Sequence, residues 1–252
     1  MNRVILSAST DETILAVTRQ HKLVDLEIEQ QINTEIVGCI YKGIVKNIVP
    51  AVDGIFVDIG IGKNAFLRRK DLLNEKRFPT EGSPILAQVI KSDTDMKGAL
   101  ITEKISMLGK YAVTLSGTGY IGVSKKIRSE SVRERLKETG KEICAEHMGL
   151  IIRTAAENAD MDEFRKDIIR LKENWDIIQK RFRMEKSPTL LYRESDIIVK
   201  ALRDYVNKGT EILITDNRKI YERICKLNES EHTIEPDKIS PVSYTHLTLP
   251  TT

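Results

Sequence analysis

Short apolar runs rich in β-branched residues, separated by polar turns, open the sequence and constrain its fold more than any other feature. The first three runs begin at Val4, Ile14 and Leu23, a pattern typical of a three-stranded meander. A meander of about thirty residues cannot bury its own faces. Another part of the chain must therefore cover it. We expect the C-terminal segment, where strand-like and helix-like runs alternate, to do so.

Strand-like runs continue through residues 36–118, with turn residues such as Pro50, Gly60 and Pro84 at the corners. About five short strands within about eighty residues suit a small closed barrel of the OB type better than a sandwich. Residues 36–116 hold twelve Lys and Arg against eight Asp and Glu, whereas residues 1–35 hold three against six. The chain's net charge of +3 therefore hides a basic barrel, although a charge run is more often only a solvated face.

The sequence pattern changes period after the predicted barrel and becomes helical. The spacing of Ser131 and Glu134 predicts a capping box that opens a short helix ending near Gly140. Asp160 is the predicted cap of a longer helix that carries an apolar stripe. Strands and helices then alternate, with a strand at 189–192, a helix at 196–206, a strand at 211–215 and a helix at 216–227.

The order of these elements predicts an α+β fold in which one α/β subdomain is split by insertions. Residues 1–35 and 189–240 form the split subdomain, because the meander must rejoin the C-terminal strands and helices. Residues 36–118 form the OB barrel, and residues 119–188 form a small α/β subdomain. The remaining residues, 241–252, contain no charged side chain.

Two phenylalanines of the predicted barrel, Phe56 and Phe66, lie on different strands with Lys and Arg nearby in the sequence. Exposed aromatic rings in a basic groove stack the bases of single-stranded RNA. The alternative is that both rings belong to the barrel core, and their spacing alone does not separate the two interpretations. Lys97 precedes a predicted strand, where it either meets a phosphate or is a solvated lysine.

Residues 149–152 form a predicted buried strand that ends in Arg153 and Thr154. An arginine offers a bidentate fork to phosphate oxygens, and a threonine hydroxyl with its adjacent backbone N–H adds donors. The pair therefore predicts a phosphate pocket at a strand end. The alternative is an ordinary strand-end salt bridge.

Residues suited to metal catalysis form no recognisable motif. Asp25 and Glu27 share one face of a predicted strand, but metal-assisted hydrolysis of RNA needs acidic side chains that converge on one or two Mg²⁺ ions. The four histidines lack metal or triad spacing, and the three cysteines form no Cys-x-x-Cys pair.

No stretch has the character of a membrane span or a signal peptide, so we expect a cytoplasmic protein.

Several motifs follow one another in a characteristic order. They are Ile40-Tyr41-Lys42-Gly43, Phe56-Val57-Asp58-Ile59-Gly60, Phe66-Leu67, Lys97-Gly98-Ala99-Leu100-Ile101-Thr102, Gly122-Val123-Ser124-Lys125-Lys126-Ile127, Gly149-Leu150-Ile151-Ile152-Arg153-Thr154 and Arg203-Asp204-Tyr205. Together they resemble the N-terminal half of the bacterial ribonuclease E/G family. The resemblance runs from Met1 to about Ser240.

The resemblance implies a ribonuclease-H-like subdomain without a nuclease role, split by an OB-fold RNA-binding domain of the S-one type and by a sensor for the 5′ end of RNA. Where better-known relatives have Arg in the stretch 124–126, this chain has Lys, which loses the bidentate fork. The implied RNA contacts of the barrel are Phe56, Phe66 and Lys97, and the implied contacts to a 5′-monophosphate are Arg153, Thr154, Gly109, Val113 and Lys125.

In the resembled family the active site lies on a later DNase-I-like domain. Two aspartates hold Mg²⁺ there, and a Cys-x-x-Cys zinc link then joins two protomers. The resemblance therefore implies no catalytic or metal-binding residue and no cofactor for this chain, and a homo-oligomer only for the full-length protein. We expect a truncated gene with a foreign tail at 241–252, because these uncharged residues resemble a translated sequencing adapter.

These observations predict the RNA-binding, 5′-end-sensing part of an endoribonuclease that acts on single-stranded RNA in rRNA maturation and mRNA decay. The chain itself should bind 5′-monophosphorylated RNA without cleaving it. Two alternatives stay open. The chain is a stand-alone, non-catalytic OB-fold RNA-binding protein, or Asp25 and Glu27 belong to a working ribonuclease-H-like metal site.

Overall fold

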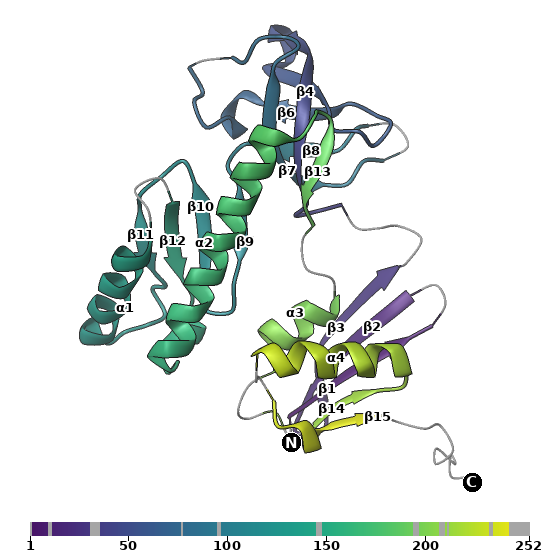
Figure 1. Ribbon diagram of the computed structural model, residues 1–252, viewed down its shortest axis with the longest axis vertical. Helices are drawn as coiled ribbons and strands as arrows, with labels where there is room; N and C mark the ends of the chain where they lie inside the picture. The colour runs from purple at the N-terminus through teal and green to yellow at the C-terminus, as the bar shows by residue number, and fades with distance from the viewer. Residues whose placement is uncertain are drawn as a thin grey trace. The chain divides into compact units, whose positions relative to one another are not determined.

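The computed structural model divides into two compact units, residues 1–35 with 195–252 and residues 36–194, which we call the split unit and the inserted unit (Figure 1). The expected tail at 241–252 lies outside the described residues, except for Pro241. The structure describes residues 2–9, 12–30, 36–76, 78–94, 97–144, 148–193, 197–206, 210, 212–231 and 234–241.

The split unit is a five-stranded sheet with the strand order β15-β14-β1-β2-β3. Helices α3 (Ile197–Asp204) and α4 (Arg218–Glu231) pack on one face over a core that includes Val4 and Leu6. The turn η4 (Pro236–Lys238) leads into the last strand. The strands are β1 (Asn2–Ala8), β2 (Glu12–Arg19), β3 (Lys22–Gln30), β14 (Ile212–Thr215) and β15 (Ile239–Pro241).

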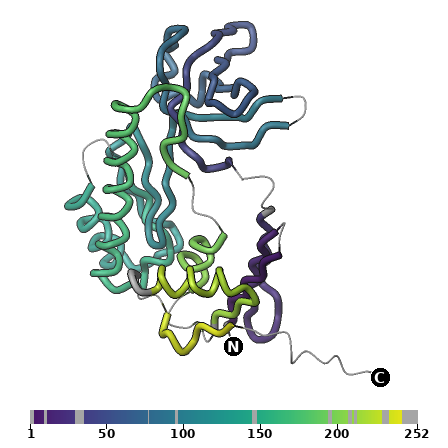
Figure 2. Tube along the Cα trace, turned by 45° about the vertical axis from the view of Figure 1, so that its right-hand side comes forward, coloured from purple at the N-terminus to yellow at the C-terminus, as the bar shows by residue number. Residues whose placement is uncertain are grey.

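The predicted meander and its return to the C-terminal segment are confirmed. Strands β1, β2 and β3 pair antiparallel in sequence order, and β1 pairs parallel with β14, with Val4 opposite Leu213. Figure 2 shows the purple N-terminal strands beside the yellow-green C-terminal helices of the same unit. The argument that the meander cannot bury its own faces therefore predicted correctly that the C-terminal segment packs against it.

Five strands of the inserted unit close into the predicted barrel. Their order is β4-β5-β6-β8-β7, and β4 pairs again with β7. Ile55, Val57 and Leu67 point inward and are fully buried. Two short turns, η1 (Pro50–Val52) and η2 (Arg69–Asp71), connect the strands. The barrel strands are β4 (Ile40–Val49), β5 (Gly54–Asp58), β6 (Ala65–Arg68), β7 (Pro84–Lys91) and β8 (Leu100–Thr102).

The remainder of the inserted unit contains a four-stranded sheet, which we call the small sheet. Its strands are β9 (Ser106–Leu108), β10 (Ala112–Ser116), β11 (Ile121–Val123) and β12 (Met148–Ile152), in the order β11-β12-β10-β9. Helices α1 (Glu130–Ile143) and α2 (Met161–Met184) cover one face, where Leu136, Phe164 and Ile168 share a core with the strands. The turn η3 (Thr154–Ala156) follows β12.

Three assignments made from local pattern differ in the structure. The segment that we placed at the end of the barrel forms β9 and β10 of the small sheet. Strand β13 (Thr189–Tyr192), which we placed in the split subdomain, pairs with β4 of the barrel. Helix α1 begins at Glu130, before the expected capping box, and Ser129 makes no side-chain cap. Apolar alternation identifies a strand but not the sheet that it joins, because pairing partners are set by tertiary packing.

Helix α2 connects the small sheet with the barrel inside the inserted unit. At its N-terminus Asp160 is the cap, as predicted, and its carboxylate accepts the N–H of Asp162 at 2.8 Å. At its C-terminus Lys42 of β4 donates to the carbonyls of Phe182 and Glu185, both at 2.7 Å. A cation at this end of a helix also interacts favourably with the helix dipole.

Candidate functional site

Phe56 and Phe66 form an aromatic pair on the barrel surface. They lie opposite each other on β5 and β6, and their ring centroids are 5.4 Å apart. Both are half-buried at positions that alternate with the fully buried Ile55 and Leu67, so they face away from the barrel core. The core interpretation of these two rings is therefore wrong. A Cβ on Gly54 would lie 2.2 Å from Cε2 of Phe66, so the glycine makes room for that ring.

Lys97 lies on a segment that adjoins the same aromatic pair. The N–H of Phe66 donates to the carbonyl of Ala99 at 2.7 Å, which places this segment beside β6. The N–H of Thr94 donates to the carbonyl of Lys97 at 2.8 Å, and Lys63 donates from Nζ to the carbonyl of Thr94 at 2.9 Å. The side chain of Lys97 is exposed. The structure thus places the segment that carries Lys97 beside β6, and Lys63 contacts the same segment.

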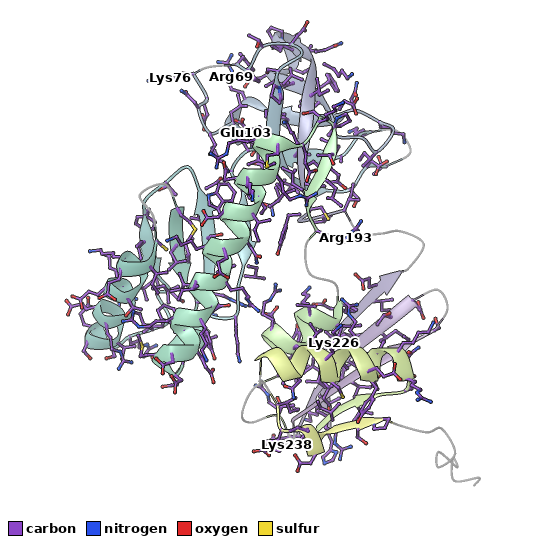
Figure 3. All side chains as sticks on the ribbon, in the orientation of Figure 1. Arg69, Lys76, Glu103, Arg193, Lys226 and Lys238 are labelled. Carbon is purple, nitrogen blue, oxygen red and sulfur yellow. The ribbon has the colours of Figure 1, made fainter. Side chains whose placement is uncertain are left out.

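Several Lys and Arg residues lie at the end of β6 and on the connection that follows it, and some of them make contacts within the fold. Arg68 pairs with Asp71 in η2, and Nε of Arg69 lies 2.8 Å from the carboxylate of Asp53. The guanidinium of Arg69 also lies 4.1 Å from the ring centroid of Phe78. Figure 3 shows the side chains of Arg69 and Lys76 on this connection between β6 and β7. The charge run is therefore partly structural.

Segments distant in the sequence meet at one edge of the small sheet. Ala112 of β10 and Val123 of β11 are both register partners of Ile152 in β12. The turn at residues 109–111, Ser124, Arg153 and Thr154 therefore follow at the same edge, and we call them the strand-end cluster. Of the residues predicted from the sequence, this edge brings together Gly109, Arg153 and Thr154, with Lys125 one residue beyond Ser124.

Arg153 is held across the turn of the cluster. Its N–H donates to the carbonyl of Tyr111 at 2.8 Å. Its Nη1 donates to the carbonyls of Gly109 at 2.7 Å and of Lys110 at 3.1 Å. The backbone bond fixes the main chain of Arg153 and the two Nη1 bonds fix its guanidinium, so a positive charge is held at the strand ends. The N–H of Gly109 is used within the fold, because it donates to the carbonyl of Ala112 at 2.8 Å.

Thr154 contributes a hydroxyl that is paired with a second hydroxyl. Its Oγ1 lies 2.9 Å from Oγ of Ser124, and either atom can donate. The carbonyls of Ser124 and Ile127 accept Nη1 of Arg133, at 2.8 Å and 3.0 Å. Arg133 on α1 thus holds the turn that carries Lys125, whose side chain is exposed. Two hydroxyls and an exposed ammonium group therefore accompany the guanidinium at this edge.

Asp167 on α2 holds the 109–111 turn from behind, and sequence reasoning missed it. Its side chain is 4% exposed, and its carboxylate accepts the backbone N–H groups of Lys110 at 3.1 Å and of Tyr111 at 2.8 Å. The same carboxylate forms an ion pair with Arg170, whose Nη2 lies 3.0 Å away. A Cβ on Gly109 would lie 2.5 Å from Oδ2 of Asp167, so the carboxylate needs a glycine here. The available signal was an acidic residue directly before Ile168 in the apolar stripe of α2.

Tyr111 anchors the other side of the same turn. Its hydroxyl donates to Glu163 at 2.6 Å. Burial, together with this hydrogen bond and the nearby carboxylates, raises the pKa of Tyr111 above its ordinary value. Val113 follows in β10, half-buried on the face of the small sheet opposite the helices, with Ile151 as its register partner.

Asp25 and Glu27 are engaged within the split unit. The hydroxyl of Tyr205 donates to Asp25, and the carboxylate of Glu27 lies 2.7 Å from Nζ of Lys200. In the described part of the chain, no group of three or more His, Cys, Asp or Glu side chains is arranged to hold a metal ion. Asp25 and Glu27 therefore do not fit a Mg²⁺ or Zn²⁺ site.

The described helices include none that is long and apolar enough to span a membrane.

Two family models match the chain. The S1 RNA binding domain matches residues 35–102, which include the aromatic pair and Lys97. The ribonuclease E/G family model matches residues 106–248, more than half of the chain. The chain belongs to the ribonuclease E/G family. The family match includes the strand-end cluster, so the resemblance inferred from the sequence motifs is confirmed.

Curated members of the ribonuclease E/G family align with nearly the whole chain. Ribonuclease G of Escherichia coli strain K12 is 33% identical over 240 residues, which cover 88% of this chain and 49% of that protein. Ribonuclease G of Haemophilus influenzae is 31% identical, covering 90% of this chain and 50% of its own length. Ribonuclease E of Haemophilus influenzae is 30% identical, covering 96% and 27%. The chain spans about half the length of the ribonuclease G relatives that it matches.

Proposed function

We propose that this chain binds single-stranded RNA on its barrel and recognises a 5′-monophosphate at the strand-end cluster, as the N-terminal part of a ribonuclease E/G-type endoribonuclease. The small sheet with its helices is then a 5′-end sensor, and the split unit is a ribonuclease-H-like subdomain without a nuclease role. The observation that carries the proposal is that a guanidinium held by two carbonyls and a pair of hydroxyls lie at one edge of the small sheet. Lys110 is part of the turn at this edge, and Lys125 lies one residue beyond Ser124.

The chemistry of the cluster suits a terminal phosphate group. A phosphomonoester carries close to two negative charges at neutral pH and offers three strong acceptor oxygens. The Arg153 guanidinium supplies a fixed positive charge, and the Thr154 and Ser124 hydroxyls supply donors. Lys125 adds a point charge that reaches the phosphate without the fixed fork of an arginine. An RNA that ends in a 5′-hydroxyl lacks this partner and should bind less tightly.

The chemistry of the barrel suits the body of a single strand. Base stacking on an aromatic side chain contributes roughly 1–3 kcal/mol and tolerates any base. The tilted pair of Phe56 and Phe66 presents such rings on β5 and β6, and the segment that carries Lys97 lies alongside β6. Lysines release counterions from RNA phosphates when they bind, so the affinity of the barrel should fall steeply with salt.

Cleavage belongs, in this proposal, to the part of the relatives that this chain does not span. The Mg²⁺ site and the Zn²⁺ link of the full-length protein are assigned to that part, and no residue of this chain has a metal role. The chain should therefore bind RNA without cutting it when Mg²⁺ is added. Mg²⁺-dependent cleavage that is abolished by changing one acidic residue, such as Asp25, would contradict this assignment.

The test compares two 3′-labelled RNAs of one sequence, one with a 5′-monophosphate and one with a 5′-hydroxyl, by fluorescence anisotropy. Wild type should bind the monophosphorylated RNA more tightly, and Arg153→Ala should bind both RNAs equally. Phe66→Ala should weaken both affinities about tenfold and keep the preference, because one stacking contact is lost. Equal affinity of wild type for the two RNAs would overturn the sensor role. That result would favour a stand-alone OB-fold RNA-binding protein.

A further inference from the structure

The face of the small sheet opposite α1 and α2 carries exposed and half-buried apolar side chains beside the strand-end cluster. Ile151 on this face is 40% exposed, whereas its two neighbours along β12 are fully buried. The register places a row of four residues side by side across this face. On β12 the row lies at Ile151, one position before Ile152, where the strands reach the strand-end cluster. The row consists of Leu108, Val113, Ile151 and Gly122, on β9, β10, β12 and β11.

Tyr120 lies at the β11 end of this row and is 64% exposed. A Cβ on Gly122 would lie 2.8 Å from Cε1 and 3.2 Å from Oη of Tyr120, so the ring rests directly against this glycine. The backbone of Tyr120 is fixed on both sides. Its carbonyl accepts the N–H of Leu150 at 2.9 Å, and its N–H donates to Oγ1 of Thr118 at 3.1 Å. A held backbone thus presents a largely exposed aromatic ring.

We propose that Tyr120 and Ile151 form a stacking platform for unpaired bases that follow the 5′-terminal nucleotide of a single-stranded RNA. This inference rests on the proposed recognition of the 5′-monophosphate at the strand-end cluster. Neighbouring strands lie about 4.8 Å apart, so Val113 and the ring over Gly122 are separated by ~10 Å across the sheet. The row therefore offers room for more than one base.

The distribution of charge around the row indicates that a nucleic acid, rather than another protein, binds this face. The four residues of the row are uncharged, whereas the adjoining edge carries Lys110, Lys125 and Arg153. An RNA strand has the matching pattern, with phosphates that face the basic edge and apolar base faces that cover the row. A typical protein–protein interface buries about 800 Å² on each partner, more than a row of four residues provides.

The test measures binding of the 252-residue chain to a 3′-labelled, 5′-monophosphorylated RNA and to the same RNA with abasic second and third nucleotides. Wild type should bind the abasic RNA about tenfold more weakly. Tyr120→Ala should lose about tenfold in affinity for the intact RNA and show little further loss with the abasic RNA. Tyr120→Phe should restore the affinity for intact RNA, because the phenylalanine ring also stacks.

Control variants separate the platform from general effects on the fold. Ile177 on α2 is 55% exposed, and Ile177→Ala should leave both affinities unchanged. Gly122→Ala should displace the Tyr120 ring without removing it and should lower affinity for the intact RNA alone. Thermal unfolding of each variant checks that the chain remains folded.

Three outcomes would overturn the platform. Tyr120→Ala could bind intact RNA like wild type, or it could lose affinity equally for intact and abasic RNA. A change in oligomeric state by sedimentation, with unchanged RNA affinity, would assign the face to a second copy of the chain. The preference for a 5′-phosphate, measured on the abasic RNA, keeps the two proposals apart. If only the platform is lost, Tyr120→Ala still prefers the abasic RNA with a 5′-monophosphate over the one with a 5′-hydroxyl. If the sensor role itself is wrong, wild type shows no such preference.

Discussion

The barrel and the strand-end cluster each depend on a glycine that makes room for another group, but they build their surfaces in different ways. In the barrel, Gly54 leaves space for the ring of Phe66, and the strands themselves present the rings. In the cluster, Gly109 leaves space for the carboxylate of Asp167, which lies behind the turn that holds Arg153. The barrel surface therefore follows from strand alternation, whereas the cluster depends on a helix that packs from elsewhere in the chain.

The largest expected effect comes from removing the group behind the cluster. Asp167→Ala leaves the N–H groups of Lys110 and Tyr111 without this acceptor and removes one ion-pair partner of Arg170. We expect the free energy of unfolding to fall by about 3 kcal/mol, measured by urea denaturation. Asp176→Ala, at an exposed position of the same helix, is the matched control and should change it by less than about 0.5 kcal/mol. Equal losses would show that the cluster is not held in this way.

The two glycines give the sharpest contrast between the regions. Gly54→Ala should push the Phe66 ring aside and lower RNA affinity about tenfold for RNAs with either 5′ end. Gly109→Ala should displace the Asp167 carboxylate and reduce only the preference for a 5′-monophosphate. Anisotropy titrations of both RNAs with both variants measure these effects. If both substitutions changed the same RNA property, the two regions would not have separate roles.

A smaller effect is expected from the hydroxyl pair of the cluster. Thr154→Val keeps the size of the side chain but removes the hydrogen bond to Ser124. We expect a loss of about 1 kcal/mol in the free energy of unfolding and a reduced preference for the 5′-monophosphate. A double-mutant cycle with Ser124→Ala isolates the pair, and the two losses should be less than additive. Strict additivity would indicate that the hydroxyls do not interact.

The sequence was sufficient for features that depend on local pattern. The meander, the closed barrel and the Asp160 cap all follow from runs of residues that lie close together. Phe56 and Phe66 were recognised as candidates, but their outward orientation needed the register of β5 with β6. The return of the chain to the first sheet followed from a burial argument rather than from any single motif.

Features that depend on tertiary packing were not accessible in the same way. Thr189–Tyr192 has a strand pattern, but only the structure shows that it pairs with β4. Asp167 stands in the helix sequence as one acidic residue among several, and its role appears only when α2 packs behind the 109–111 turn. The exposed ring of Tyr120 became informative once Gly122 and Ile151 were seen to share its face.

The central claim is that the strand-end cluster recognises a 5′-monophosphate through a fixed guanidinium rather than through positive charge alone. The most direct measurement compares the affinities of wild type and Arg153→Lys for one RNA with a 5′-monophosphate and with a 5′-hydroxyl. Lysine keeps the charge but lacks the planar guanidinium whose Nη1 donates to the carbonyls of Gly109 and Lys110. We expect the preference for the monophosphate to be lost in Arg153→Lys while the affinity for the 5′-hydroxyl RNA is kept. An undiminished preference in this variant would contradict it.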